Sequence, residues 1–146
     1  MDIRKAQKGD LGQILELYTQ LHGNDIPPFD KQLEILWRDI LEDKHHYILV
    51  GVSEQKIISS CVVLVIPNLT HNQRSYALIE NVVTHEAHRN KGYATQLLNF
   101  AREIATEQRC YKIMLMTGSK QESTWRFYER AGYNAADKKA FIQWIE

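Results

Sequence analysis

The stretch Leu78–Thr95, LIENVVTHEAHRNKGYAT, decides the fold, because the period of its apolar residues changes inside it. Up to Val83 the apolar run predicts a strand. Beyond Gly92, apolar residues recur at helical spacing and predict a helix that ends near Gln108. The residues that keep this spacing are Leu97, Leu98, Ala101, Ile104 and Ala105. A strand therefore leads through a short polar loop into a helix, as in α/β folds.

The start of this helix has the chemistry of an anion site. A helix N-terminus exposes unpaired backbone N–H groups and carries partial positive charge. Gly92 has no Cβ and Ala94 has the smallest one, so a ligand can approach the backbone closely. Arg89 and Lys91 add formal charge beside the amides. The loop suits a diphosphate, although a solvated basic first turn would have the same residues.

Other ligand patterns are absent from this region. Neither the P-loop pattern GxxxxGK[ST] nor the dinucleotide pattern GxGxxG occurs. His85 and His88 lie three residues apart, and His45 and His46 are adjacent, but the sequence shows no further metal ligands with them. We interpret all four as surface or loop histidines and expect no metal.

The elements downstream complete a crossover. Tyr111–Met116 is predicted as a strand, and with the strand Tyr76–Val83 and the intervening helix it forms a right-handed unit whose two strands are parallel. Ser123–Arg130 is predicted as a helix that ends at Gly132. The alternation in Phe141–Ile145 predicts a closing strand.

The elements upstream predict an antiparallel meander preceded by two helices. They are the strand Asp2–Gln7, a helix with Asp10 as its N-cap, a helix with Asp30 as its N-cap, and the strands Tyr47–Val52 and Ile57–Ile66. The apolar face of the first helix consists of Leu11, Ile14, Leu15, Tyr18 and Leu21, and that of the second consists of Leu33, Leu36, Trp37, Ile40 and Leu41. The fold class is therefore α/β, with a mixed, mostly antiparallel sheet. It has a central parallel strand pair and about four flanking helices. We expect one domain over residues 1–146.

Composition narrows the class of protein. The 146 residues include 44% hydrophobic and 25% charged residues, and 18 Lys plus Arg balance 18 Asp plus Glu. This balance argues against nucleic acid as the main partner. Cys61 and Cys110 lie in apolar runs and are interpreted as packing residues. No signal peptide and no membrane span are expected, which favours the cytoplasm.

Two motifs resemble a known family. Arg89-x-x-Gly92-x-Ala94, preceded by Val82–Thr84, resembles motif A of the GNAT family of N-acetyltransferases, whose pattern is R/Q-x-x-G-x-G/A. The segment Arg126–Tyr133, RFYERAGY, resembles the late Phe-Tyr-Glu signature of the same family. The order of the predicted elements is also similar along almost the whole chain. The resemblance implies the GNAT fold, in which the parallel strands splay apart.

The resemblance implies acetyl-coenzyme A as co-substrate and assigns residues to it. The strand residues Val82, Val83 and Thr84 correspond to positions whose backbone pairs with the pantetheine arm. The pyrophosphate cradle corresponds to Arg89, Asn90, Lys91, Gly92, Tyr93, Ala94 and Thr95. Gln121 falls where many members have an Asn that contacts the cofactor, and a Gln amide offers the same hydrogen-bonding groups.

Acetyl transfer to an amine requires a base, because most of an alkyl amine is protonated at neutral pH. Glu80 is the leading candidate; alternatively it positions a water chain or lies on a solvent face. Tyr128 corresponds to the family's general acid for the departing thiolate, although a core aromatic residue fits its spacing too. The thioester oxygen is expected to receive a backbone N–H from Val82 or Val83, which needs a distortion of the strand.

The acceptor is predicted to be a primary amine of a small molecule that attacks directly in a ternary complex. Ile79–Val83 and Cys110–Ile113 resemble the glucosamine-6-phosphate N-acetyltransferase branch, but Asn81 replaces its Asp and Met116–Gln121 departs from it. A protein N-terminal or lysine acetyltransferase and a non-catalytic acetyl-coenzyme A sensor stay open as alternatives. Trp144 could line the acceptor site or a homodimer contact.

Overall fold

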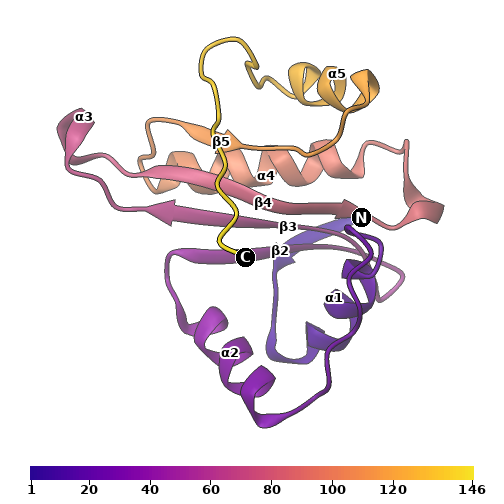
Figure 1. Cartoon of the computed structure of the whole chain (residues 1–146). Helices are drawn as coiled ribbons and strands as arrows, with labels where there is room; N and C mark the ends of the chain where they lie inside the picture. Colours follow the sequence, from indigo (N-terminus) through magenta and orange to yellow (C-terminus); the bar gives the residue numbers. More distant parts are fainter. The chain divides into compact units, whose positions relative to one another are not determined.

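The computed structural model describes all 146 residues and divides them into two compact units, Met1–Leu115 and Met116–Glu146. Figure 1 labels their helices and strands. The strands of the first unit are β1 (Asp2–Lys5), β2 (His46–Ser53), β3 (Lys56–Ile66), β4 (Tyr76–Thr84) and β5 (Ile113–Leu115). Its helices are η1 (Lys8–Asp10), α1 (Leu11–Tyr18), α2 (Lys31–Glu42), α3 (Thr70–Gln73), η2 (Glu86–His88) and α4 (Tyr93–Glu107). The second unit contains α5 (Glu122–Arg130).

The sheet of the first unit is mixed, with strand order β1-β2-β3-β4-β5 (Figure 1). The first four strands pair antiparallel with their neighbours, whereas β4 and β5 pair in parallel. The predicted α/β class and the parallel crossover through α4 are therefore confirmed. Because β5 is the last of the five strands, the parallel pair lies at one edge of this sheet.

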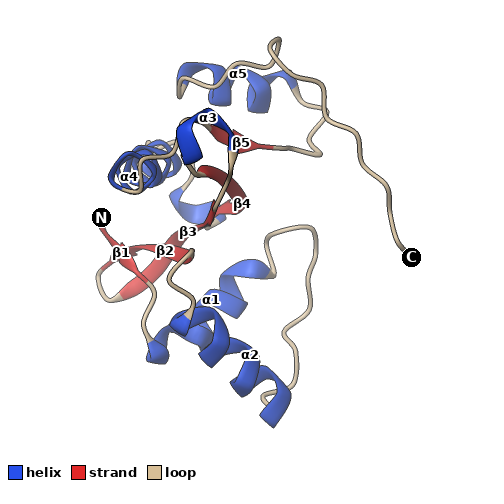
Figure 2. Ribbon diagram, turned by 90° about the vertical axis from the view of Figure 1, so that its left-hand side faces the viewer, coloured by secondary structure: helices blue, strands red, loops and turns tan.

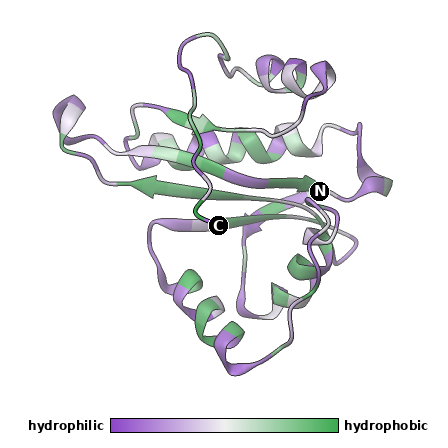
Figure 3. Cartoon of the chain, viewed as in Figure 1, coloured by the Kyte–Doolittle hydropathy of each residue, from purple (hydrophilic) through white to green (hydrophobic).

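Helices cover the sheet of the first unit, with α4 on one side and α1 and α2 on the other (Figure 2). The apolar residues concentrate on the strands and on the helix faces turned towards them (Figure 3). The cluster under α1 and α2 comprises Ala6, Ile14, Leu17, Trp37, Ile48, Val50, Ile57, Val62 and Val83. Alternation along the strands places Leu49, Cys61, Val63 and Ile79 on the α4 side. Both faces of the central strands are thus buried.

Two aspartates predicted as helix caps behave differently. Asp30 caps α2 as predicted, since its carboxylate accepts a hydrogen bond from the Leu33 backbone N–H at 2.9 Å. Asp10 precedes α1 but makes no cap to it. Its carboxylate instead accepts from the Gln7 N–H at 2.7 Å and from the Arg4 guanidinium at 2.6 Å and 3.0 Å. Asp10 is the last residue of the turn η1, and its carboxylate ties this turn to Arg4 on β1. It therefore stabilises the turn and does not cap α1.

The second unit confirms one prediction and corrects another. The helix predicted at Ser123–Arg130 is present as α5. The strand predicted at Phe141–Ile145 is wrong, because that segment has no strand pairing and Phe141 is 88% exposed. Alternation fixes which side chains share a face, but a strand also needs a neighbour for its backbone groups, and this unit contains no other strand. No helix of the chain has the length and apolar character needed to cross a membrane.

Candidate functional site

The strand β4 extends beyond its parallel neighbour. Its register with β5 pairs Ala77 with Ile113 and ends at Ile79 opposite Leu115. The five residues Glu80–Thr84 therefore continue past the end of β5, which offers them no strand partner. Backbone N–H and C=O groups on that edge can pair with an added extended ligand. The family resemblance assigns the pantetheine arm to Val82–Thr84 within this segment, and that assignment stays a prediction.

The same strand is distorted on its other side. Against β3, Glu80 pairs with Val62 and Val83 pairs with Ser60, so β4 uses three steps where β3 uses two. This is a β-bulge at Asn81–Val82, and Asn81 has a left-handed φ of 52°. Asn is among the residues that tolerate this region best. The strand distortion that the carbonyl-binding role requires is thus present directly after Glu80.

The register also fixes the face on which Glu80 lies. Directly opposed residues of an antiparallel pair project from the same face of the sheet. Val62, the partner of Glu80, packs in the cluster under α1 and α2. Glu80 therefore projects towards the α1 and α2 side, and its side chain is only partly buried.

Hydrogen bonds hold the end of β4 and the loop that follows. Thr84 Oγ1 lies 2.8 Å from the buried Ser59 Oγ, which also donates to the Val83 carbonyl at 3.1 Å. The Arg89 Nε donates to the Thr84 carbonyl at 3.1 Å. His85 accepts a bond from the Ala87 N–H, so it orders the turn η2 rather than acting as a free base. The loop is thus anchored at both ends by its own residues.

The loop then enters α4 through a left-handed glycine. Gly92 is the N-cap of α4 with φ 79° and ψ 7°, and no side chain caps this helix end. A Cβ added at Gly92 would meet no atom within 4 Å, so the space beside the Gly92 backbone is open. The side chains of Arg89 and Lys91 are exposed beside them. Open backbone N–H groups with two flanking cations fit a pyrophosphate group.

The remaining predicted residues belong to the second unit, and their part in the site stays a prediction. Gln121 is the N-cap residue of α5, and its own N–H donates to Ser119 Oγ at 3.2 Å. Tyr128 lies within α5 and packs its ring against Phe127 and Tyr133, with centroid distances of 4.9 Å and 6.2 Å. The structure therefore brings Glu80, the Val82–Thr84 strand and the loop together in one unit, without Gln121 and Tyr128.

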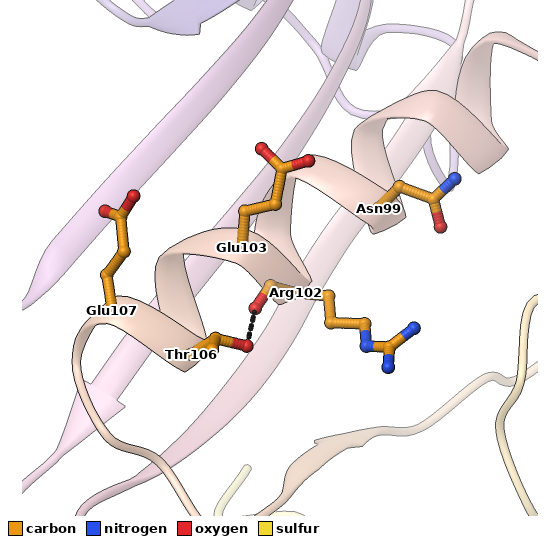
Figure 4. A pocket seen from close by; sticks show the side chains of 5 residues that line it. All are labelled: Asn99, Arg102, Glu103, Thr106 and Glu107. Carbon is orange, nitrogen blue, oxygen red and sulfur yellow. Dashed lines mark hydrogen bonds between the residues drawn. The ribbon is translucent and has the colours of Figure 1, made fainter.

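A shallow hollow on the outer surface of α4 does not coincide with these residues (Figure 4). It is lined by Asn99, Arg102, Glu103, Thr106 and Glu107. All five come from one helix, and three of them carry charges of mixed sign, positive on Arg102 and negative on Glu103 and Glu107. The Thr106 hydroxyl is already bonded to the Arg102 carbonyl at 2.8 Å. The hollow has no convergent set of groups for a ligand.

Sequence reasoning missed two features of this site. The left-handed turn at Asn81 was not predicted, although an Asn inside an apolar strand is a recognisable signal for it. The second is Tyr18, which was assigned only to the apolar face of α1. Its hydroxyl is buried without a hydrogen-bond partner in the protein. The spacing of apolar residues cannot show where a phenol oxygen ends up.

Comparisons with known proteins agree with this geometry. A family model described as the acetyltransferase (GNAT) family matches residues 11–133. A solved structure of a proposed acetyltransferase from Agrobacterium tumefaciens str. C58 is 34% identical, covers 99% of this chain and 100% of its own, and has a TM-score of 0.90. A transcriptional regulator from Bacillus halodurans C-125 is 29% identical, with 98% and 99% covered and a TM-score of 0.84. Glucosamine-6-phosphate N-acetyltransferase from Arabidopsis thaliana shares the fold, with 22% identity, 99% and 98% covered and a TM-score of 0.87.

The chain belongs to the acetyltransferase (GNAT) family, because the family model matches most of its length. It is accordingly an acetyl-coenzyme A-dependent N-acetyltransferase with the fold of that family. The family identity and the fold predicted from the two motifs are confirmed.

Proposed function

We propose that this protein transfers the acetyl group of acetyl-coenzyme A to a primary amine of a small molecule by direct attack in a ternary complex. The observation that carries the proposal is the double opening of β4. Its edge is free beyond Ile79, and its ladder with β3 is interrupted at Asn81–Val82. Both openings adjoin Glu80, so a base candidate lies where the strand can receive an extended ligand. In this proposal the two units act as one acetyltransferase domain.

The residues proposed to bind acetyl-coenzyme A are those with unpaired backbone groups on β4 and at the start of α4. The edge of Val82–Thr84 pairs with the amides of the pantetheine arm, as an added strand would. The first-turn amides of Tyr93, Ala94 and Thr95, with Arg89 and Lys91, hold the pyrophosphate. The left-handed backbone of Asn90, with φ 60°, and of Gly92, with φ 79°, turns the chain from the loop into the first turn of α4. Gln121 is proposed as a further contact through its amide. When bound, acetyl-coenzyme A supplies the activated thioester carbonyl.

Glu80 and Tyr128 are proposed to move the two protons of the reaction. The Glu80 carboxylate, directly or through water, takes a proton from the amine, so that the nitrogen lone pair is free to form the C–N bond. The C–S bond breaks, and the Tyr128 hydroxyl donates its proton to the departing sulfur. A phenol suits this role because it is protonated at neutral pH. After the C–N bond forms, the nitrogen loses a second proton, which restores the Tyr128 phenol through water, and Glu80 releases its proton to the solvent. The products are the acetylated amine, the free thiol and one proton.

The bulge supports a role for one backbone amide. Val83 keeps its register partner Ser60 on β3, whereas Val82 has none. We therefore propose Val82 rather than Val83 as the donor that stabilises negative charge on the thioester oxygen. A fixed backbone donor of this kind needs no reorganisation during the reaction.

The test is a thiol-release screen with acetyl-coenzyme A against a broad panel of amines that includes glucosamine 6-phosphate. Turnover on small amines and none on a peptide array supports the proposal, and the reverse pattern indicates a protein acetyltransferase. Cofactor binding by calorimetry without turnover on any amine would instead indicate a sensor. Local similarity at Ile79–Val83 makes an amino sugar phosphate the sharpest member of the panel.

The role of Glu80 is tested by Glu80→Gln, with Glu107→Gln on the exposed end of α4 as matched control. A direct base predicts that kcat/KM falls and that the shape of its pH profile changes in the Glu80 variant, whereas the control keeps the wild-type profile. An unchanged profile would remove Glu80 as the base. Tyr128→Phe should lower kcat with little change in acetyl-coenzyme A affinity, and full turnover would refute its role as acid.

A further inference from the structure

The Tyr18 hydroxyl is a buried polar group that the first unit leaves without a hydrogen bond. Tyr18 is the last residue of α1 and packs against the cluster that includes Val62 and Val83. Its Oη is buried and has no hydrogen-bond partner in the protein. Most buried side-chain polar atoms are paired, so an unpaired phenol requires an explanation. No other buried side-chain nitrogen or oxygen of the chain is in this state.

The neighbours of this hydroxyl place it at the bulge of β4. The side chains of Ser60 and Asn81 lie near enough to influence it, although neither meets it in hydrogen-bond geometry. The Ser60 hydroxyl is already committed, since it donates to the Leu49 carbonyl at 2.8 Å. Ser60 is fully buried, whereas Asn81 is exposed. The hydroxyl therefore lies beside the bulge, near one buried and one exposed residue.

Glu80 and Tyr18 share one face of the sheet. Glu80 opposes Val62, and Val62 belongs to the cluster against which Tyr18 packs. Burial raises the pKa of the Tyr18 phenol, and Ser60 and Asn81 offset only part of that rise. The phenol thus stays protonated at neutral pH and can both donate and accept a hydrogen bond. A carboxylate and a neutral hydroxyl are complementary partners for one amine nitrogen.

We propose that Tyr18 is an acceptor-binding residue whose hydroxyl hydrogen-bonds the reacting amine of the acceptor beside Glu80. The inference rests on the proposed function and deepens it. Once Glu80 has taken the ammonium proton and released it to water, the hydroxyl accepts one N–H of the neutral amine and the Glu80 carboxylate accepts the other, which leaves the nitrogen lone pair directed away from both. Displacement of the Asn81 side chain opens the way to this hydroxyl. Holding a nucleophile in one orientation lowers the barrier by reducing the freedom that it must lose.

In the free protein the Tyr18 hydroxyl makes no hydrogen bond, so its effect on substrate binding can be separated from its effect on stability. A buried group without a partner lowers stability, so its removal without change of shape is neutral or stabilising. Tyr18→Phe keeps the ring and removes only Oη. Tyr47→Phe on β2 is the matched control, because that ring lies over Lys5 Nζ at 4.7 Å and Phe preserves the contact. Both variants are compared with the wild type by thermal melting, calorimetry with acetyl-coenzyme A, and steady-state kinetics on the best amine of the panel.

For Tyr18→Phe we expect a melting temperature equal to or above that of the wild type and an unchanged affinity for acetyl-coenzyme A. The kcat/KM for the amine should fall by about tenfold, the effect of one lost hydrogen bond to a substrate. Tyr47→Phe should match the wild type in kcat/KM. Wild-type kcat/KM in Tyr18→Phe overturns the inference. A drop in both melting temperature and cofactor affinity also overturns it, since that indicates a structural role. Absence of turnover by the wild type on every amine refutes the proposed function itself and is seen without any variant.

Discussion

Replacing Gly92 by Ala isolates the backbone conformation at the start of α4. The added Cβ meets no atom within 4 Å, so no steric clash contributes. What changes is the cost of φ 79°, a left-handed conformation that disfavours a residue with a Cβ by about 1 kcal/mol. The loop has two ways to respond. If the loop keeps its conformation, the free energy of unfolding of the protein falls by this amount. If the loop relaxes, the same free energy is lost from ligand binding, because the ligand must restore the left-handed conformation.

The two responses are separated by measuring stability and binding together. Retained geometry predicts a melting temperature lower by roughly 3 °C and an unchanged Kd for coenzyme A. Relaxation predicts an unchanged melting temperature and a Kd raised by roughly fivefold, the equivalent of about 1 kcal/mol. In both cases the complex is less stable by about the same total. The assays are differential scanning calorimetry and isothermal titration with coenzyme A.

Gly12→Ala is a control in which the same substitution should change the stability of the protein in the opposite direction. It lies in α1, and a Cβ there also meets nothing within 4 Å. Because its backbone is helical, Gly12→Ala should stabilise the protein by about 0.5–1 kcal/mol. Wild-type stability together with wild-type coenzyme A affinity in Gly92→Ala would refute the reasoning, because the left-handed conformation would then carry no cost.

Three further predictions concern stability and reactivity. Asp10→Asn should destabilise the protein by about 1–2 kcal/mol at pH 7. The Arg4 hydrogen bond lowers the pKa of Asp10 below its ordinary value of 3.8, so the charged form stabilises the fold above that pH. The gap between wild type and variant in urea melts should therefore close as the pH falls below about 4; a gap independent of pH contradicts the ion pair. Asp30→Ala should cost about 1 kcal/mol through loss of the α2 cap, whereas Asp30→Asn should be nearly neutral, and equal losses in chemical unfolding would exclude capping. Cys61 is fully buried and burial raises its pKa to about 12, so mass spectrometry should find iodoacetamide on the partly exposed Cys110 and none on Cys61 until the protein unfolds.

The sequence predicted the elements of the first unit well because each depends on local spacing. The period change at Gly92 and the caps and turns around α2 and β3 act over a few residues, and their positions agree with the structure. The strand predicted at Phe141–Ile145 failed for the opposite reason, since pairing depends on a partner elsewhere in the chain. Asp10 is an intermediate case. Its residue type favours a cap, but the guanidinium of Arg4 on β1 takes the carboxylate.

The candidate site was predictable where it consists of backbone and charge. The loop from Arg89 to Thr95 needs only a glycine, two cations and a helix start, all visible in the sequence. The bulge at Asn81–Val82 depends on register against β3, and the unpaired Tyr18 hydroxyl depends on how α1 packs. Neither quantity is local. The residues proposed to act on the amine are therefore harder to predict than those proposed to hold the cofactor.

In the proposed reaction, the pairing of the strand β4 accounts for the placing of both halves of the reaction at Glu80. A strand with a neighbour on each side uses all its backbone N–H and C=O groups in the sheet and has none left for a ligand. Here the β5 side is free from Glu80 onwards, and the β3 side is interrupted one residue later, at Asn81. The first opening admits an extended arm along the edge, and the second frees an amide within reach of its end. Because the two departures overlap at Glu80–Val82, the reacting carbonyl, the base and the amine can share one place. The strand β4 departs from regular pairing at Glu80–Val82 and pairs regularly with β3 along the rest of its length. Such a local departure from regular structure is expected at a functional site.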